Sequence, residues 1–333
     1  MALPRHSVSS MRLTATGRKL EFASSASREP AGPDLLIQIS ACGVCRTDVH
    51  VVDGDIEARL PIVPGHEIVG RVIATGAKVT EYVVGDRIGV PWLAWTCGEC
   101  LYCRNGRENL CERARFTGFT RDGGFASHCI ADARYCLSIP KQYGDAEAAP
   151  LLCAGLIGYR AYRRAGSGEC IGLYGFGAAA HILAQVACFE GRRVFAFTRS
   201  GDRDAQHLAL SLGCVWAGAS DEPSPEPLDA AIIFAPVGAL VPQALRQLRK
   251  GGQLVCAGIH MSDIPSFRYA DLWGERAISS VANLTRADGR DFMEIAQRIP
   301  IEVHATSLPL SRANEALDLL RNGAVEGALV LRP

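Results

Sequence analysis

The second half of the chain contains a glycine-rich turn between an apolar run and a helical segment, and this turn limits the fold more than any other feature. Residues 170–174 form the apolar run, Gly175, Gly177 and Ala180 follow in a G-x-G-x-x-A pattern, and residues 178–190 have helical periodicity. Alone, the pattern is often an ordinary turn. After a strand and before a helix it is a dinucleotide fingerprint, because the glycines let the backbone approach a pyrophosphate.

Strands and helices alternate through the remainder of this region. Apolar runs predict strands at residues 193–197, 228–234 and 253–257, and helical patterns occupy residues 204–212 and 242–248. Alternation at this spacing is typical of a parallel, doubly wound sheet. The sequence therefore predicts an α/β fold with a Rossmann domain.

The first part of the chain has a different pattern. Residues 11–90 are rich in β-forming residues, with strands predicted at 35–39, 68–74 and 87–90 and no helical periodicity. This part is expected to form a β-rich, partly open barrel.

The C-terminal residues do not continue the alternating series. A helix is predicted at 289–298, a strand at 301–304, a helix capped by Ser311, and a last strand at 327–331. We expect this tail to return to the first domain.

The charge balance limits the classes of partner. The 333 residues carry 35 basic and 35 acidic side chains. A zero net charge argues against nucleic acid or an anionic membrane surface as the main partner. The N-terminus lacks the apolar core of a signal peptide, and no apolar stretch has the length of a membrane span. A cytoplasmic protein with no membrane partner is therefore expected.

Four of the 13 cysteines form the strongest local motif. Cys97, Cys100, Cys103 and Cys111 have the spacing C-x2-C-x2-C-x7-C. Thiolates at this spacing surround one face of a tight loop and can bind a tetrahedral zinc. Four cysteines leave no open position for a substrate, so this zinc is predicted to be structural. Iron in a sulfur-only site is the alternative.

A second group of possible ligands lies within residues 41–67. Cys42 and Cys45 have the spacing of a ligand pair, and His66 follows a proline-flanked turn. A lone histidine is more often a buried core residue than a ligand. Together with Cys45 and Cys153, however, His66 would leave a fourth zinc position open for water or substrate, which is the arrangement of a catalytic zinc.

The residues after the second predicted cofactor strand bear on cofactor choice. An Asp or Glu at this place would hold the adenine ribose, whereas this chain has Thr198, Arg199 and Ser200. A hydroxyl followed by an arginine suits a 2′-phosphate and favours NADP over NAD. The alternative is that Arg199 is a solvated loop residue and that NAD is accepted.

Together these motifs resemble the zinc-dependent alcohol dehydrogenases of the medium-chain dehydrogenase/reductase (MDR) family. Residues 65–79 look like the family signature G-H-E-x2-G-x5-G-x2-V, and residues 43–48 and the four-cysteine loop match as well. The resemblance covers the chain from about Met11 onward.

The resemblance implies a division into two domains. Residues 1–153 and 283–333 would form a GroES-like catalytic domain that includes a structural-zinc loop at 92–113. Residues 154–282 would form the Rossmann nucleotide-binding domain.

The resemblance also implies how the catalytic zinc is held. Cys45, His66 and Cys153 would be its ligands, while Cys42 packs behind them. Glu67 would be a carboxylate close to the metal, and Asp48 would hydrogen-bond His66 and fix its orientation.

A reaction path follows from the same resemblance. Zinc would bind the alcohol oxygen and lower its pKa, so that an alkoxide forms. The proton would leave through Thr47, the nicotinamide ribose and His50, and hydride would pass to the nicotinamide. Arg46 would contact the pyrophosphate.

Two departures from the family pattern concern the cofactor. The acidic residue after the second cofactor strand is absent, and the C-terminal segment reads Glu326-Gly327-Ala328 where many relatives carry an arginine after the glycine. The short loops resemble those of microbial relatives that are homodimers or homotetramers.

Three functions are compatible with these motifs. We favour an NAD(P)-dependent alcohol dehydrogenase that acts on primary or simple secondary alcohols. The first alternative is an NADPH-preferring aldehyde reductase of the cinnamyl alcohol dehydrogenase type. The second is a non-catalytic protein that binds zinc or nucleotide, which should lack the open-site ligands that this chain retains.

Overall fold

The computed structural model describes residues 6–323 and 327–333, and the chain separates into two compact units. Unit 1 comprises Met1–Cys153, Leu284–Gln297 and Val303–Pro333, and unit 2 comprises Ala154–Asn283 and Arg298–Glu302. Among the described residues, no helix combines the length and the apolar character needed to cross a bilayer.

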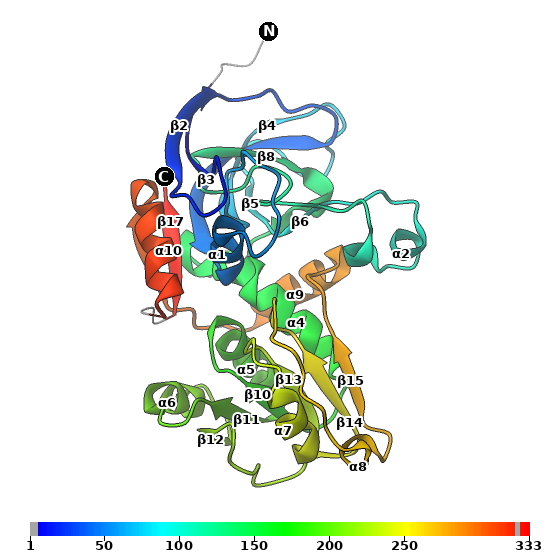
Figure 1. Ribbon diagram of the computed structural model, residues 1–333. Coiled ribbons are helices and arrows are strands. Elements are labelled where there is room, and N and C mark those ends of the chain that lie inside the picture. The colour runs from blue at the N-terminus through cyan, green and yellow to red at the C-terminus, as the bar shows by residue number, and fades with distance from the viewer. Residues whose placement is uncertain (1–5, 324–326) are drawn as a thin grey trace. The chain divides into compact units, whose positions relative to one another are not determined.

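Unit 2 is built on a six-stranded parallel sheet with the order β12-β11-β10-β13-β14-β15 (Figure 1). The chain starts at the central β10, moves outward to β12, and then continues on the other side from β13 to β15. This order is the doubly wound topology, so the predicted fold class is confirmed. The strands are β10 (Cys170–Tyr174), β11 (Arg193–Thr198), β12 (Trp216–Ala219), β13 (Leu228–Ile233), β14 (Leu248–Cys256) and β15 (Ala277–Ser280). The helices are α4 (Ala154–Arg164), α5 (Ala178–Phe189), α6 (Arg203–Ser211), α7 (Leu240–Gln247) and α8 (Tyr269–Leu272).

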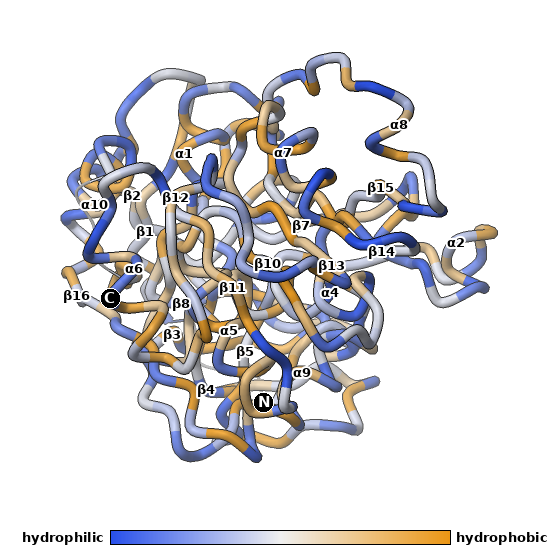
Figure 2. Tube along the Cα trace, turned by 90° about the horizontal axis from the view of Figure 1, so that it is seen from below, coloured by the Kyte–Doolittle hydropathy of each residue, from blue (hydrophilic) through white to orange (hydrophobic). Residues whose placement is uncertain are grey.

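Continuous apolar runs explain why the central strands of unit 2 were visible in the sequence. Every residue of β10 is buried, and five of the six residues of β13 are buried as well. Strands buried on both faces have no polar alternation. Tyr174 and Phe197 stack across β10 and β11 with ring centroids 4.1 Å apart. The hydrophobic colouring along these strands can be followed in Figure 2.

Unit 1 is organised around a seven-stranded sheet with the order β16-β17-β3-β4-β5-β9, in which β8 also pairs with β3 (Figure 1). The last strand, β17, pairs antiparallel with β3, so the C-terminal strand is part of the same sheet as strands from the N-terminal half. The strands of unit 1 are β1 (Ser7–Arg12), β2 (Glu21–Ala26), β3 (Asp34–Val44), β4 (Glu67–Thr75), β5 (Arg87–Val90), β6 (Leu93–Trp95), β7 (Arg115–Phe116), β8 (His128–Asp132), β9 (Leu137–Ser138), β16 (Ala305–Pro309) and β17 (Ala328–Arg332). The helices are α1 (Arg46–Asp53), α2 (Leu101–Arg104), η1 (Glu108–Leu110), η2 (Ala133–Tyr135), α3 (Asp145–Ala148), η3 (Pro150–Leu152), α9 (Arg286–Arg298), η4 (Leu310–Arg312) and α10 (Ala313–Arg321).

The prediction that residues 11–90 contain no helix was wrong, because α1 lies within them. Its eight residues include three valines, which favour strands, and they are too few to show a clear helical period. The ends of the helix stabilise it instead. Asp48 accepts the backbone N–H of Cys45 at 2.8 Å, and Gly54 ends the helix in the left-handed region with φ of 88°.

Two details of the C-terminal tail also differ from the prediction. The strand expected at 301–304 is instead β16, which begins at Ala305 because its parallel pairing with β17 starts there. The apolar residues Ile301 and Val303 are buried core residues without being part of a strand. Ser311 does not cap a helix, because it lies inside η4 and α10 begins after it. The position of Glu326 falls outside the described residues.

Candidate metal centres and cofactor turn

The carboxylate of Asp48 joins the two segments that carry the first predicted ligands. It accepts the N–H of Cys45 at 2.8 Å at the start of α1, and the N–H of Gly65 at 3.0 Å, one residue before His66. Its Oδ1 lies 3.3 Å from His66 Nδ1, and both side chains are 1% exposed. With Nδ1 facing the carboxylate, the ring presents Nε2 on its opposite side.

The ligand atoms of Cys45, His66, Glu67 and Cys153 lie within 4.8 Å of one another. The two sulfur atoms are 3.8 Å apart, and His66 Nε2 is 3.3 Å from Cys153 Sγ. A tetrahedral zinc with bonds of about 2.3 Å to sulfur and about 2.0 Å to nitrogen would separate two sulfurs by about 3.8 Å, and a sulfur from a nitrogen by about 3.5 Å. The donor set and its spacing therefore fit a zinc ion closely.

The titrating groups of this cluster influence one another strongly. A hydrogen bond from Cys153 lowers the pKa of Cys45, and the same bond together with burial raises the pKa of Cys153. Burial raises the pKa of Glu67. Burial opposes the charged form of His66, but the Asp48 carboxylate and the Cys45 sulfur together raise the pKa of this imidazole. Such crowding of acidic groups in a buried place favours the binding of a cation.

Cys42 and Gly43 precede Cys45 and differ from it in their role. Cys42 is fully buried and donates to the Gly43 carbonyl at 3.5 Å, and it is not part of the ligand cluster. An ideal Cβ at position 43 would lie 1.8 Å from Glu67 Oε2. A glycine is therefore required at position 43 to make room for the carboxylate. Of the two cysteines considered as a pair, only Cys45 lies among the ligand atoms.

The predicted relay residues lie on α1. Thr47 is buried, and its Oγ1 accepts a hydrogen bond from Cys45 Sγ at 3.7 Å. His50 follows one helical turn later on the same face and is partly exposed. Arg46, predicted to contact a pyrophosphate, is exposed on the same helix. The short helix thus carries a ligand at its N-cap and a line of polar side chains leading to the surface.

An aromatic group beside His66 was only partly visible in the sequence. Trp92 contacts the His66 ring edge-on, with ring centroids 4.8 Å apart. Phe116 and Phe119 stack on Trp92 at 5.3 and 5.6 Å. From the sequence alone, Trp92 is compatible with a core or a pocket wall, and nothing marks the two phenylalanines as its neighbours. They follow the four-cysteine loop, which folds back to bring them here.

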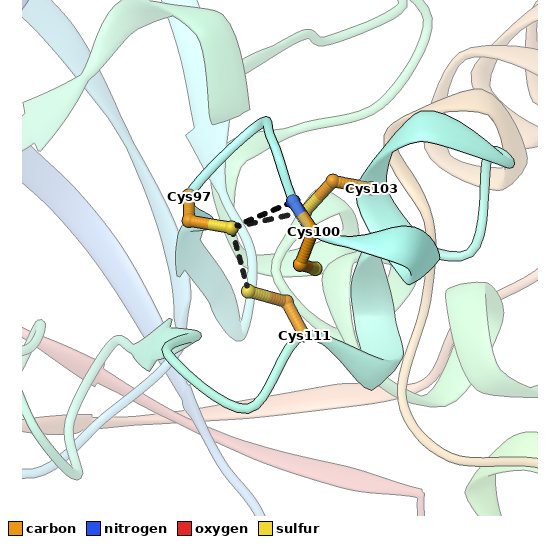
Figure 3. A group of neighbouring side chains, drawn as sticks. All are labelled: Cys97, Cys100, Cys103 and Cys111. Carbon is orange, nitrogen blue, oxygen red and sulfur yellow. Dashed lines mark hydrogen bonds between the residues drawn. The ribbon is translucent and has the colours of Figure 1, made fainter.

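The four-cysteine loop forms a second cluster between β6 and β7. The sulfur atoms of Cys97, Cys100, Cys103 and Cys111 lie within 4.8 Å of one another, and Figure 3 shows the four side chains side by side. Cys97 Sγ is 3.8 Å from Cys103 Sγ and 3.6 Å from Cys111 Sγ. A hydrogen bond from the backbone of Glu99 lowers the pKa of Cys97 to about 6. These distances are close to the sulfur spacing of about 3.8 Å that tetrahedral zinc requires.

A buried carboxylate ties this loop to α9 within unit 1. Glu108 accepts the backbone N–H of Arg286 at 3.1 Å, and its Oε1 is 3.3 Å from the guanidinium Nε of the same arginine. The guanidinium of Arg286 also lies over the Tyr135 ring, 5.0 Å from its centroid. The loop is therefore held at its base, while Leu101 at its outer end is 73% exposed.

The glycine turn of unit 2 has the backbone that a dinucleotide site needs. Gly175 has φ of 85°, and an ideal Cβ there would lie 2.9 Å from Ala235, so the position requires glycine. Gly177 is the N-cap of α5, and nothing lies within 4 Å of its ideal Cβ. Ala180 is fully buried in the first turn of the helix. The open surface over the start of α5 can receive a phosphate.

The three residues predicted to select the cofactor differ in their surroundings. Thr198 is buried. Its Oγ1 accepts a hydrogen bond from the Gln206 side-chain amide at 3.0 Å and donates one to the Gly218 carbonyl at 3.3 Å. Its hydroxyl is thus bound within the protein. Arg199 and Ser200 are exposed at the end of β11. A 2′-phosphate would therefore meet Arg199 and Ser200 rather than Thr198.

Replacing Asp48 by asparagine is expected to weaken zinc binding at the Cys45, His66 and Cys153 cluster by about 10–100-fold. The amide has no negative charge, and its NH2 group cannot accept the hydrogen bonds that the carboxylate now accepts. Competition with a chromophoric chelator measures the affinity, and zinc in the four-cysteine loop serves as the control within the same molecule. Unchanged affinity, or equal loss from both clusters, would contradict this role.

Comparison with known proteins identifies the family of the chain. Residues 31–141 match the family described as the alcohol dehydrogenase GroES-like domain. The chain is 49% identical over 311 residues to the probable alcohol dehydrogenase AdhA of Mycobacterium tuberculosis, covering 91% of this chain and 89% of that one. It is 35% identical over 311 residues to an alcohol dehydrogenase of Geobacillus stearothermophilus, with 90% and 91% covered. The solved structure of a cinnamyl alcohol dehydrogenase from Sorghum bicolor superposes with a TM-score of 0.88 at 25% identity, covering 98% and 97% of the two chains.

The chain is similar to alcohol dehydrogenases over nearly its full length. It also has a GroES-like unit with two candidate ligand clusters and a Rossmann unit with a glycine turn. The chain therefore belongs to the zinc-dependent, NAD(P)-dependent alcohol dehydrogenases of the MDR family.

Proposed function

We propose that this alcohol dehydrogenase oxidises primary and simple secondary alcohols, and reduces the matching aldehydes and ketones, at a catalytic zinc held by Cys45, His66 and Cys153. The observation that carries the proposal is the ligand spacing, 3.8 Å between the sulfurs and 3.3 Å from His66 Nε2 to Cys153 Sγ. Three ligands leave one tetrahedral position for the substrate. A second zinc, bound by the four-cysteine loop, is proposed to be structural.

The residues of the chain orient the substrate site and move the proton. Zinc supplies a Lewis acid that lowers the pKa of an alcohol hydroxyl, and the nicotinamide cofactor supplies the hydride acceptor. Asp48 orients His66, and Glu67 is a carboxylate close enough to approach the metal. Thr47, beside Cys45, takes the proton of the substrate hydroxyl, and His50 passes it towards solvent.

The cofactor is proposed to be NADP in preference to NAD. The start of α5 supplies positive potential for the pyrophosphate, and Gly175, Gly177 and Ala180 allow its close approach. Arg199 and Ser200 are exposed beside the turn, where a carboxylate would be needed to hold an unphosphorylated ribose.

Replacing Arg199 by alanine is expected to lower kcat/KM for NADP by about tenfold or more, because a charged hydrogen bond to phosphate is lost. The value for NAD should change little, since NAD lacks the 2′-phosphate. Initial rates with both cofactors measure the ratio.

Lys250→Ala is a matched control for this experiment. It removes the same charge from an exposed side chain of unit 2 in the first part of β14, at the opposite end of the parallel strands from the glycine turn. Its NADP/NAD ratio should equal that of the unmodified enzyme. A ratio that Arg199→Ala leaves unchanged would refute the cofactor assignment.

The cinnamyl alcohol dehydrogenase type of aldehyde reductase is a second candidate, favoured by the similarity to the sorghum structure and by the aromatic group at Trp92. A panel of aliphatic and aromatic alcohols and aldehydes, assayed with NAD(H) and NADP(H) by nicotinamide absorbance, separates the two. Higher kcat/KM for short aliphatic alcohols supports our proposal. Higher kcat/KM for cinnamaldehyde-type substrates with NADPH supports the second candidate, and no turnover of either class would reject both.

A homodimer or homotetramer is proposed as the assembly. The strand β15 lies at the edge of the six-stranded sheet, and the aromatic side chains of Tyr269 and Trp273 shortly before it are largely exposed. An open edge and exposed aromatic rings favour contact with a second copy of the chain. Analytical ultracentrifugation measures the mass of the assembly, and a monomer at assay concentration would contradict the proposal.

A further inference from the structure

The outer turn of the four-cysteine loop is an Asn-Gly pair. Asn105 is the C-cap of α2, Gly106 follows it with φ of 64°, and both residues are exposed. Nothing lies within 4 Å of an ideal Cβ at Gly106, so the left-handed backbone and not packing accounts for the glycine. The pair lies in the chain between the ligand residues Cys103 and Cys111, and it is open to water.

An Asn-Gly pair can react with itself. The Gly106 nitrogen loses its proton and bonds to the side-chain carbonyl carbon of Asn105, and ammonia leaves. Water then opens the resulting succinimide ring at either of its two C–N bonds, which gives aspartate or isoaspartate. One amide and one water thus become one carboxylate and one ammonium ion, without an oxidant or a reductant. Glycine obstructs this ring closure least, because it has no side chain.

The loop holds both reacting groups in place. Asn105 Nδ2 donates to the Leu101 carbonyl at 2.8 Å, and the N–H of Gly106 donates to the Cys103 carbonyl at 3.3 Å. The next N–H, of Arg107, donates to the Tyr102 carbonyl at 2.9 Å. Ring closure requires the Gly106 nitrogen to give up its hydrogen-bonded proton and to turn towards the side chain. These bonds therefore protect Asn105 for as long as the turn of α2 keeps its shape.

The turn of α2 has no packing of its own to preserve that shape. The helix has four residues, none of them buried, and a single helical turn is not stable in water by itself. Cys100 is its N-cap and Cys103 its third residue, so two ligand residues bracket the turn (Figure 3). A zinc ion bound to both would fix the carbonyls that accept the three hydrogen bonds.

We propose that Asn105 is a modification site at which loss of zinc from the four-cysteine loop becomes permanent, because the released loop lets Asn105 cyclise onto Gly106 and hydrolyse. The inference rests on the structural zinc of the proposed function. Isoaspartate adds one atom to the backbone between Cys103 and Cys111, and both products add a negative charge beside four thiolates. The modified loop should therefore bind zinc less tightly than the original one.

A surface asparagine whose reaction depends only on its exposure and on the following glycine is the other explanation. The second Asn-Gly pair of the chain, Asn322-Gly323, separates the two. Asn322 is likewise an exposed C-cap, and the N–H of Gly323, with φ of 69°, donates to the Leu320 carbonyl at 3.2 Å. Its helix α10, however, is held by buried apolar residues and contains no metal ligand. Asn322 is therefore an internal reference whose reaction should not depend on zinc.

The first experiment measures deamidation at each asparagine by peptide mass spectrometry during incubation of the full-length enzyme at neutral pH. Cys103→Ser should react at Asn105 about tenfold faster or more than the zinc-loaded unmodified enzyme, the factor that two typical hydrogen bonds provide. Cys153→Ser is the matched control, since it removes the same atom from the catalytic cluster and should leave Asn105 as slow as before. Unmodified enzyme stripped of zinc with a chelator should behave like Cys103→Ser. Asn322 should react at one rate in all four samples.

The second experiment tests permanence with the Cys153→Ser enzyme, in which only the four-cysteine loop is expected to bind zinc. The protein is stripped with a chelator, incubated, and given zinc again, and competition with a chromophoric chelator measures the affinity. The affinity should fall by about tenfold in the molecules that carry isoaspartate at position 105. Asn105→Gln keeps an amide but closes its larger ring much more slowly. After the same incubation it should bind zinc as tightly as at the start.

The outcomes distinguish the structural zinc from the role of Asn105. If fresh Cys153→Ser enzyme binds no zinc, the structural site of the proposed function fails. If it binds zinc but Asn105 reacts equally fast with and without the metal, the protection is overturned. The same holds if removal of zinc accelerates Asn322 by the same factor, because the change would then be general unfolding. Full recovery of affinity in enzyme modified at Asn105 would overturn the permanence of the loss.

Discussion

Replacing Cys153 by serine is expected to abolish turnover while the fold is retained. Loss of this ligand removes the Lewis acid from the substrate site, which costs several kcal/mol of transition-state stabilisation and lowers kcat/KM by at least about 10³-fold. Cys153 follows η3, and its Sγ lies 3.8 Å from Cys45 Sγ and 3.3 Å from His66 Nε2. Cys45, the other thiol of the cluster, is itself a proposed ligand and therefore cannot replace it. Steady-state kinetics and metal analysis measure the effect, and the zinc content should fall from about two ions per chain to about one.

Cys129→Ser is the matched control for this variant. Cys129 is buried in β8 of the same unit and belongs to neither ligand cluster, so the same exchange of sulfur for oxygen should leave both zinc ions and the turnover in place. Normal activity of Cys153→Ser, or retention of both zinc ions, would show that the catalytic ligand has been assigned wrongly.

The second large effect is expected in the four-cysteine loop. Cys103→Ser should release the structural zinc and lower the melting temperature by about 10 °C. Metal binding contributes several kcal/mol to the stability, and each kcal/mol lost lowers the melting temperature by about 2–4 °C in a domain of this size. The loop around α2 and η1 has only a few buried residues, so its structure depends on the metal. Differential scanning calorimetry gives the shift, and limited proteolysis should find new cleavage between Cys97 and Cys111.

Leu101→Ala tests whether the effect comes from the ligand rather than from the loop surface. Leu101 is the exposed residue between two of the cysteines, and its truncation should leave zinc content and melting temperature nearly unchanged. If Cys103→Ser melts at the temperature of the unmodified enzyme, the loop does not derive its stability from zinc.

The Rossmann unit was predicted almost completely because its signals are local. The strand at residues 170–174 and the helix that follows it were found with boundaries within one residue of β10 and α5. Apolar runs and glycine punctuation mark such elements without reference to distant parts of the chain. The short edge strands β12 and β15 were missed, because they contain few β-branched or large apolar residues.

The GroES-like unit was harder to predict because its elements depend on distant partners. The position of β16 is fixed by pairing with β17, and no pattern within residues 301–309 reveals where that pairing begins. Likewise, α1 is held by end contacts rather than by periodicity. The candidate ligand residues were proposed from their types and spacing, whereas the contact between Asp55 and His50 depends on a turn whose direction becomes visible only in three dimensions.

The two hydrogen bonds that Asp48 accepts from the backbone of Cys45 and Gly65 have a consequence for how this protein can vary. One carboxylate fixes the two ends of the intervening segment, so the geometry of the ligands does not depend on the length of the chain between them. Within that segment, the side chains of residues 56–61 alternate, with Glu57, Arg59 and Pro61 exposed and Ile56, Ala58 and Leu60 packed against the core. Substitutions at the exposed positions leave this packing in place. A designer can therefore reshape this rim of the enzyme while leaving the metal centre as it is.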